Sequence, residues 1–558
     1  MPISITLNAG PLQETVQQAL AELSSQNILA RIAERDYSVW RSQPEEIDNR
    51  LGWLDCPHTM PAHIEEIHRV IDAARADGLT HALLLGMGGS SLAPEVFRQV
   101  FGVTNGYLDL AVLDSTEPGA VLAKTQQLDL AKTLFIPATK SGGTVETLSF
   151  LKYFYQCTAK KVGVENAGRH FVAITDPSSG LADMASALNF RHTFINDPHI
   201  GGRYSALSHF GLVAAGSIGC DLKQLITRAA QASDQTQPAL ELGAFMGAGA
   251  QQNRDKLTIF ASPKLAAVGA WVEQLVAEST GKDGKGILPV DGEEALAATA
   301  YGSDRLFVYL RLDDSDDSLD ARARDLVAAG QPLLQFDVED LYDLGAVFYH
   351  WELATAITGH LMSIHPFDQP DVEAAKILAR QMVETYHEQG QLPTEQAIAT
   401  EGALSAYAEE KASSLADALS KLLDRGQSNR SYIALQAYLN PIPETQHLLE
   451  QLRRCLQLKS GLATTLGYGP RFLHSTGQLH KGDGGNGLFL QLTASTPQDI
   501  AIPDEPNSES SALSFGVLIA AQASGDAGAL RKAGRPVLRI DLGTDIRAGI
   551  DSIIDKIS

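Results

Sequence analysis

Two glycine-rich loops in the first third of the chain have residue types suited to holding an anion. They are Gly86–Ser91 (GMGGSS) and Thr139–Thr147 (TKSGGTVET). Glycine lets the backbone approach a ligand closely, and amide groups at the start of a helix attract negative charge. The second loop adds hydroxyls and one lysine, which a phosphate monoester requires. Tight turns and helix N-caps are the ordinary alternatives. Because both loops follow strands and open helical segments, they can converge on one crevice, which favours a phosphate site.

Two later segments carry groups that could move protons or stabilise charge. Gly201–Ser205 (GGRYS) presents Arg203 on a flexible backbone, although such an arginine is often only a solvated loop charge. Gln274 and Glu278 are one helical turn apart, just before the glycine-rich turn Gly281–Gly286. Glu278 lies at the helix C-terminal end, where the helix dipole does not stabilise its charge. It is therefore a candidate general base, with an ordinary surface carboxylate as the alternative.

The elements that must position these residues are short, uninterrupted apolar runs separated by segments of helical periodicity. One set comprises 80–86, 108–114, 132–139 and 170–176, and a second comprises 257–262, 306–310 and 332–336. Strands that are apolar throughout and alternate with helices indicate a parallel sheet covered on both faces. The sequence thus predicts an α/β fold with two doubly wound parallel-sheet units.

The remaining chain is assigned by the same patterns. Residues 338–362 and 371–388 are predicted to be long helices closing the second unit, and 431–439, 488–492 and 535–542 to be strands. We expect an N-terminal helical segment (1–60), a first unit (61–225), a second unit (240–388) and a C-terminal α/β region (390–558).

Composition and charge limit the partners. The 558 residues carry 44 Lys and Arg against 67 Asp and Glu, a formal charge of −23, which disfavours nucleic acid and anionic membranes. No apolar run approaches the roughly 20 residues of a membrane-spanning helix, and the N-terminus lacks a signal-peptide pattern. The four cysteines are scattered, without metal-ligand spacing. We therefore expect a cytoplasmic protein that binds no nucleic acid or membrane.

Together these motifs resemble the phosphoglucose isomerase family. The order GxGGS, KSGGTxET, GGRYS, QxxxESxGK and Pro366–Pro370 (PFDQP), followed by Lys376, is similar to that of the family from about Leu51 to Lys376. The resemblance is to the type found fused to transaldolase, here without the transaldolase. It implies that the two α/β units are sugar-isomerase (SIS) domains.

The resemblance implies a role for each matching residue. Glu278 would be the base, Arg203 would stabilise the enediolate, and Lys376 would contact the substrate and assist ring opening. The implied substrate-binding residues are Gly89, Ser90, Thr139, Lys140, Ser141, Thr144 and Gln274.

The histidine that opens the sugar ring departs from the family pattern. The family places it between the glutamate motif and PFDQP, but residues 278–348 contain no histidine. The nearest similar segment is Leu473–Gly482 (LHSTGQLHKG), in glycine-rich surroundings. We assign ring opening to His474, with His480 as the weaker alternative and neither histidine as the third. The assignment predicts that the C-terminal region folds back over the crevice and brings His474 near Glu278 and Lys376.

The resulting hypothesis is an isomerase that interconverts glucose 6-phosphate and fructose 6-phosphate through a cis-enediol, with no metal or organic cofactor. Two alternatives remain open: an isomerase that also accepts mannose 6-phosphate, and a non-catalytic regulator that binds sugar phosphates. The expected partner is a small sugar phosphate, and a homodimer remains an open option.

Overall fold

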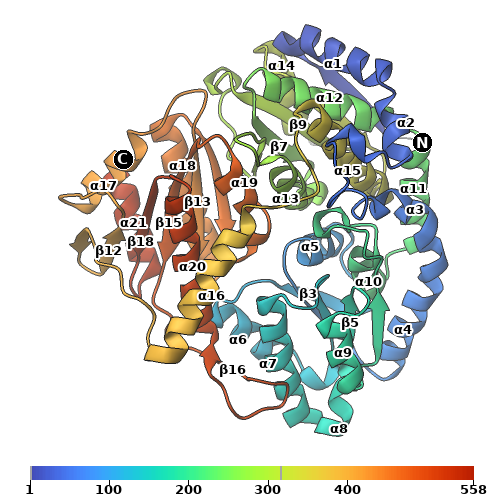
Figure 1. Cartoon of the computed structure of the whole chain (residues 1–558), viewed down its shortest axis with the longest axis vertical. Helices are drawn as coiled ribbons and strands as arrows, with labels where there is room; N and C mark the ends of the chain where they lie inside the picture. Colours follow the sequence, from blue (N-terminus) through green and yellow to red (C-terminus); the bar gives the residue numbers. More distant parts are fainter. Residues whose placement is uncertain (1–2, 314–316, 558) are drawn as a thin grey trace.

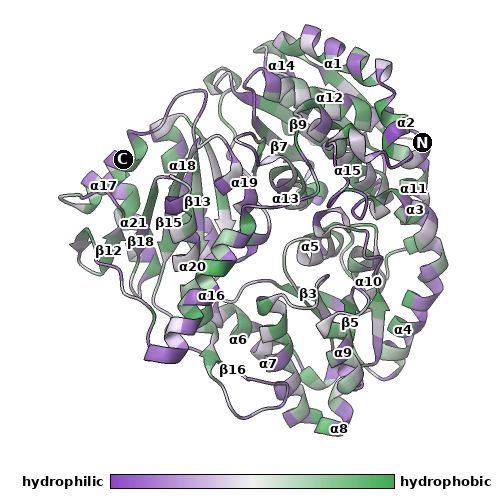
Figure 2. Cartoon of the chain, viewed as in Figure 1, coloured by the Kyte–Doolittle hydropathy of each residue, from purple (hydrophilic) through white to green (hydrophobic). Residues whose placement is uncertain are grey.

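The structure is a computed structural model that describes residues 3–313 and 317–557. Three sheets define the architecture, one in each of three consecutive parts of the chain (Figure 1). Most residues of their central strands are buried on both faces, as expected for parallel sheets covered by helices. Figure 2 shows these strands mainly in hydrophobic colours, while outer helices such as α1 (Gln13–Ser25) alternate between the two extremes. The predicted α/β class is confirmed.

The first sheet is entirely parallel, in the order β3-β2-β4-β5-β6. Its strands are β2 (His81–Gly86), β3 (Asp109–Leu113), β4 (Thr133–Ala138), β5 (Val172–Thr175) and β6 (His192–Ile195). The associated helices are α4 (Ile64–Ala76), α5 (Gly89–Phe101), α6 (Pro118–Gln127), α7 (Val145–Val162), α8 (Val164–Ala167), α9 (Gly180–Ala187) and α10 (His209–Ser217). The strand order reverses between β2 and β4, and such a reversal leaves a crevice at the carboxyl ends of the two strands. The loops after β2 and β4 are the two predicted anion loops.

The second sheet has the order β1-β10-β9-β7-β8. Its strands are β1 (Ser4–Asn8), β7 (Lys256–Ala261), β8 (Leu288–Asp291), β9 (Arg305–Leu312) and β10 (Leu333–Val338). Its helices are α11 (Leu222–Asp234), α12 (Gln237–Gln251), α13 (Val268–Thr280), α14 (Asp317–Ala328) and α15 (Leu344–Leu361). The N-terminal segment adds α1, α2 (Ile28–Ala33) and α3 (Cys56–Thr59), and also β1, which pairs antiparallel with β10. The helical periodicity of this segment did not predict that edge strand.

The C-terminal sheet has the order β11-β12-β18-β15-β13-β14, in which β14, β13, β15 and β18 are parallel. Its strands are β11 (Ala399–Glu401), β12 (Leu404–Tyr407), β13 (Tyr432–Tyr438), β14 (Ala463–Tyr468), β15 (Gly487–Thr493) and β18 (Val537–Asp541), with a separate hairpin of β16 (Ala501–Ile502) and β17 (Leu513–Ser514). The helices of this part are α16 (Val372–Gln389), α17 (Leu415–Leu423), α18 (Pro443–Ser460), α19 (Gly477–Gly482), α20 (Phe515–Lys532) and α21 (Ile546–Ile557).

Helix α16 lies in a different place from the one expected. The sequence predicts that it closes the second unit, but it packs along α20 of the C-terminal part, where Gly525 allows close contact with Ala379 (Figure 1). The domain boundaries given above remain a prediction. In the part of the chain that the structure describes, no helix is both long and apolar enough to cross a membrane.

Candidate active site

The loop after β2 is where three distant segments meet. Gly88 has φ +54°, and a Cβ there would lie 2.7 Å from the carbonyl oxygen of His474 and 2.9 Å from Nε2 of Gln274. A Cβ on Gly89 would lie 1.9 Å from the carbonyl oxygen of Gly202. Close packing therefore requires glycine at these two positions, because any side chain would collide with the neighbouring segments. Ser90 is buried directly after them, in the first turn of α5.

The loop after β4 brings together the residues predicted to bind phosphate. Oγ1 of Thr139 lies 2.8 Å from Oγ1 of Thr144, the residue before the first turn of α7. The backbone amide of Gly143 donates to Oγ of Ser141 over 3.3 Å. Lys140 forms an ion pair with Asp176 and also donates to the carbonyl oxygen of Pro198 over 2.7 Å. A ligand at this loop would thus compete with Asp176 for the lysine charge.

Arg203 is fixed at the centre of the crevice. It is only 4% exposed, and its Nε donates to Oγ of Ser279 over 2.8 Å. Its Nη1 lies 2.9 Å from Oε1 of Gln369 and 3.3 Å from Oε1 of Glu278. The carbonyl oxygens of Pro366 and Asp368 accept from Nη2 over 2.7 and 3.0 Å. The PFDQP segment therefore orients this guanidinium, and sequence reasoning assigned no such role to it.

Gln274 and Glu278 lie on the same face of α13, as their spacing predicts. Nε2 of Gln274 donates to Oε2 of Glu278 over 3.0 Å and to the carbonyl oxygen of His474 over 2.8 Å. Oε1 of Gln274 is buried and has no hydrogen-bond partner among the described residues. The Glu278 side chain is 12% exposed, so its carboxylate is shielded but reachable.

His474 lies beside this cluster and is held by a buried carboxylate. Its Nε2 is 2.9 Å from Oε1 of Glu146, which also accepts from Nε2 of Gln522 over 2.7 Å. Glu146 is 3% exposed. Burial alone would raise the pKa of Glu146, but the nearby His474 and the more distant Lys376 lower it below the usual value. Glu146 thus stays ionised and orients the imidazole. Sequence reasoning quoted Glu146 within the KSGGTxET motif without giving it a role.

The described contacts connect Gly89, Arg203, Gln274, Glu278 and His474, and Glu146 in the first turn of α7 connects this group to the phosphate loop. Lys376 stands apart from them. Lys376, on α16, is 40% exposed, and its Nζ lies 3.8 Å from Glu373. The described contacts connect it to the cluster only through its electrostatic effect on Glu146.

Three other histidines, His480, His360 and His365, make contacts with other parts of the chain. His480 is buried in the C-terminal part, where burial lowers its pKa well below the usual value, and its Nδ1 lies 3.4 Å from Nε2 of Gln436. Nδ1 of His360 lies 2.7 Å from the carbonyl oxygen of Val39, and Nε2 of His365 lies 3.1 Å from that of Glu45. Of these four histidines, His474 is the one that contacts both Gln274 and Glu146.

Two interactions fasten the His474 segment to the rest of the site. Arg471 donates two hydrogen bonds of 2.7 Å to Asp114, which directly follows β3. Gln478 donates to the carbonyl oxygen of Gly281 over 3.0 Å and to Oδ2 of Asp371 over 2.6 Å. Sequence reasoning missed these anchors because paired residues so far apart leave no local pattern.

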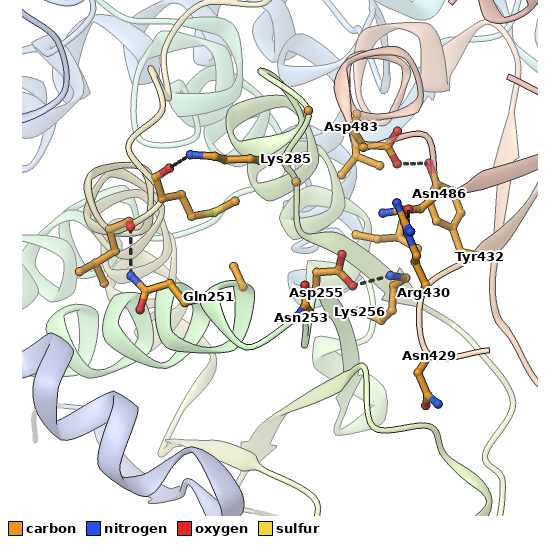
Figure 3. A pocket seen from close by; sticks show the side chains of 18 of the residues that line it. Gln251, Asn253, Asp255, Lys256, Lys285, Asn429, Arg430, Tyr432, Asp483 and Asn486 are labelled. Atoms are coloured by element: carbon orange, nitrogen blue, oxygen red, sulfur yellow. Dashed lines mark hydrogen bonds and ion pairs between the residues drawn. The ribbon is translucent and has the colours of Figure 1, made fainter. Parts of the chain in front are cut away.

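A cavity of about 650 Å³ is lined in part by the loop 284–286, which follows α13 (Figure 3). Lys285 of that loop lines it, as do Lys256, Arg430 and Asp483. None of the predicted site residues lines this cavity. It is distinct from the crevice between the two anion loops.

Comparison with known proteins supports the resemblance. The phosphoglucose isomerase family model matches residues 59–283, a range that contains both anion loops, Arg203, Gln274 and Glu278. A glucose-6-phosphate isomerase from Thermus thermophilus is 26% identical over an alignment of 408 positions, which covers 64% of this chain and 95% of that protein. One from Rubrobacter xylanophilus is 27% identical over 383 residues, covering 59% and 88% of the two chains.

Two solved structures share the fold. A hypothetical protein from Thermus thermophilus aligns with a TM-score of 0.58 at 25% identity, covering 68% of this chain and 99% of that one. A glucose-6-phosphate isomerase from Chlamydia trachomatis aligns with a TM-score of 0.56 at 19% identity, covering 67% and 86%. His474 lies outside the range matched by the family model, and the likeness to the transaldolase-fused type stays a prediction.

Proposed function

We propose that the chain interconverts glucose 6-phosphate and fructose 6-phosphate, because residues 59–283 match the phosphoglucose isomerase family model and carry the groups that this reaction needs. The observation that carries the proposal is the position of the Glu278 carboxylate. It lies 3.3 Å from the guanidinium of Arg203 and 3.0 Å from the amide of Gln274, which also donates to the His474 carbonyl oxygen. A base, a fixed cation and a phosphate loop together are what aldose–ketose isomerisation of a phosphosugar requires.

The phosphate binds at the loop after β4. The hydroxyls of Thr139, Ser141 and Thr144 and the amides at the start of α7 supply hydrogen-bond donors. Lys140 supplies the charge once the phosphate displaces Asp176 from it. Gly89 and Ser90, at the start of α5, contact the sugar. This arrangement fixes the distance between the phosphate and the reacting carbons.

Ring opening is assigned to His474. The ring oxygen must gain a proton while the C1 hydroxyl loses one, and an imidazole can transfer protons near neutral pH. Glu146, 2.9 Å from Nε2, fixes the orientation of the ring. Lys376 assists from the rim of the site.

Isomerisation then proceeds on the open chain. Glu278 removes the C2 proton of the open-chain aldose to give a cis-enediolate, and the proton of the C2 hydroxyl passes to the neighbouring O1. The same carboxylate then delivers its proton to C1 while O2 becomes the carbonyl oxygen of the ketose. The negative charge that develops on the oxygens is stabilised by Arg203, whose orientation is set by four hydrogen bonds. Gln274 holds Glu278 and leaves its buried Oε1 for a substrate hydroxyl.

The proposal also defines the partners and the compartment. The ligand is a small sugar phosphate, the chain acts in the cytoplasm without nucleic acid, and two copies form a homodimer. Isomerisation by this route requires no metal or organic cofactor.

A coupled assay tests the function directly. Purified chain is given fructose 6-phosphate, and the glucose 6-phosphate formed is oxidised by a dehydrogenase that reports reduced nicotinamide. We expect turnover of fructose 6-phosphate, but none of unphosphorylated fructose. Mannose 6-phosphate in a parallel reaction distinguishes a broader isomerase, and binding of fructose 6-phosphate without any product would make the chain a regulator instead.

A further inference from the structure

A cluster of histidines with one glutamate lies outside the proposed active site. His63 ends the short helical turn before α4, and Glu66 lies in the first turn of α4, so the two side chains share one face of the chain. His209 is the first residue of α10, which packs against α4. One ligand atom from each of these three residues lies within 4.8 Å of the others. Segments from two distant parts of the sequence thus converge on one point.

The imidazole of His209 is buried without a partner. The residue is 4% exposed, and neither Nδ1 nor Nε2 has a hydrogen-bond partner among the described residues. A buried polar group usually has a partner, and leaving it without one costs free energy. The rings of His63 and His209 meet edge to face, with centroids 4.8 Å apart.

A fourth side chain extends the cluster. His192, the first residue of β6, places Nε2 3.1 Å from Oε1 of Glu66. Nδ1 of His63 lies 3.8 Å from Oε2 of the same carboxylate. Arg69 lies 3.7 Å from Glu66 but is mostly exposed, so it can move away when a cation occupies the site.

We propose that His63, Glu66 and His209 bind a divalent transition-metal ion, with Zn²⁺ as the best match and His192 as a fourth ligand. Neutral imidazole nitrogens and one carboxylate oxygen are a ligand set that Zn²⁺ prefers. Ligand bonds of about 2.0–2.2 Å place tetrahedral donors roughly 3.4 Å apart. Rotation of the partly exposed His63 and Glu66 side chains therefore completes the shell around the fixed His209.

The role of this ion is structural. His192 lies at the amino end of β6, opposite the carboxyl ends of the strands that carry the anion loops. The ion joins α4, β6 and α10, and the segment immediately before α10 carries Arg203. Bound metal stabilises the native state because the ligands do not converge in the unfolded chain.

Equilibrium dialysis of chelator-treated full-length protein against Zn²⁺ tests the site, with metal measured by mass spectrometry and the melting temperature measured in parallel. The test variants are His63→Ala and Glu66→Gln, whose partly exposed side chains can be changed with little effect on folding. His68→Ala is the matched control, since His68 lies on the same helix but outside the cluster.

We expect one Zn²⁺ per chain, a melting temperature raised by Zn²⁺, and affinity reduced at least about tenfold in both variants but not in His68→Ala. Equal Zn²⁺ binding by the wild type and both variants would overturn the proposal, as would failure of the wild type to bind. The measurement does not depend on isomerase activity, so its outcome is separate from that of the proposed function.

Discussion

The phosphate loop 139–144 is one continuous segment, whereas Glu278 and His474, the two groups proposed to transfer protons, come from segments far apart in the chain. Thr139 and Thr144 meet across five residues. Glu146 and His474, by contrast, are 328 residues apart, and Gln274 and His474 are 200 apart. A binding loop can be encoded locally because neighbouring residues present hydroxyls and amides to one ligand. Proton transfer needs groups that surround the substrate on different sides. Such groups lie far apart in the sequence and come together only when the chain folds.

The largest expected effect is the loss of turnover when the proposed general base, Glu278, is changed. Glu278→Gln keeps the shape but removes the base, so we expect kcat to fall by roughly 10³-fold or more while KM changes little. The matched control is Glu273→Gln on the same helix, which we expect to retain activity. The coupled assay measures both, and near-normal turnover by Glu278→Gln would exclude this carboxylate as the base.

The next largest effect on turnover is expected for His474, which the C-terminal part of the chain contributes. We expect His474→Ala to slow the closed sugar by about 10²-fold and an open-chain analogue far less, because only the closed form needs ring opening. Glu146→Gln should show the same preference more weakly, since it leaves the imidazole in place without its charged partner. Turnover is measured for each variant with the closed sugar and with the open-chain analogue, and the ratio of the two rates is compared with that of the wild type.

His480→Ala is the control for that experiment and should leave the ratio unchanged, because His480 is buried away from the crevice. Equal slowing of both substrates by His474→Ala would make the C-terminal part an accessory region, with ring opening left to Lys376 or solvent.

A smaller effect is expected on the phosphate side. Lys140→Ala and Thr144→Ala should each raise KM by about tenfold and lower kcat less, because the phosphate is held similarly in the ground and transition states. Steady-state kinetics checks this, with Lys161→Ala at the far end of α7 as the charge-matched control. A collapse of kcat at unchanged KM would place the phosphate elsewhere.

The smallest effect concerns stability and is expected at Glu273, the other glutamate of α13. Burial and the nearby Asp291 raise the pKa of Glu273 to about 8. The unfolded carboxyl ionises above about 4.5, while the folded one holds its proton to about 8, so stability falls as pH rises between these values. Glu273→Gln cannot ionise, so we expect its melting temperature to exceed that of the wild type by roughly a few degrees at pH 8.5.

At pH 5 the melting temperatures of the Glu273→Gln variant and the wild type should differ much less, because stability is lost progressively only as pH rises from about 4.5 toward 8. If the difference in melting temperature were the same at both pH values, the substitution would act through side-chain packing and not through ionisation of Glu273.

Much of the fold followed from local pattern. The uninterrupted apolar runs correspond to β2, β4, β5 and β7, because strands buried on both faces must be apolar throughout. The packing partner of α16 could not be predicted, since its amphipathic pattern shows that one face is buried but not against what. The edge strand β1 was missed because its backbone pairs with β10, more than 300 residues later.

The sequence by itself determined which groups could bind phosphate and which carboxylate could act as a base, because glycines, hydroxyls and one-turn spacings act within a few residues. Only the tertiary structure decided which residues face them. It placed His474 against Gln274, paired it with Glu146, and fixed Arg203 through the PFDQP carbonyls. It also brought His63, Glu66 and His209 together. The physical reason is that these pairings form by packing between elements, and that packing leaves no periodic trace along the chain.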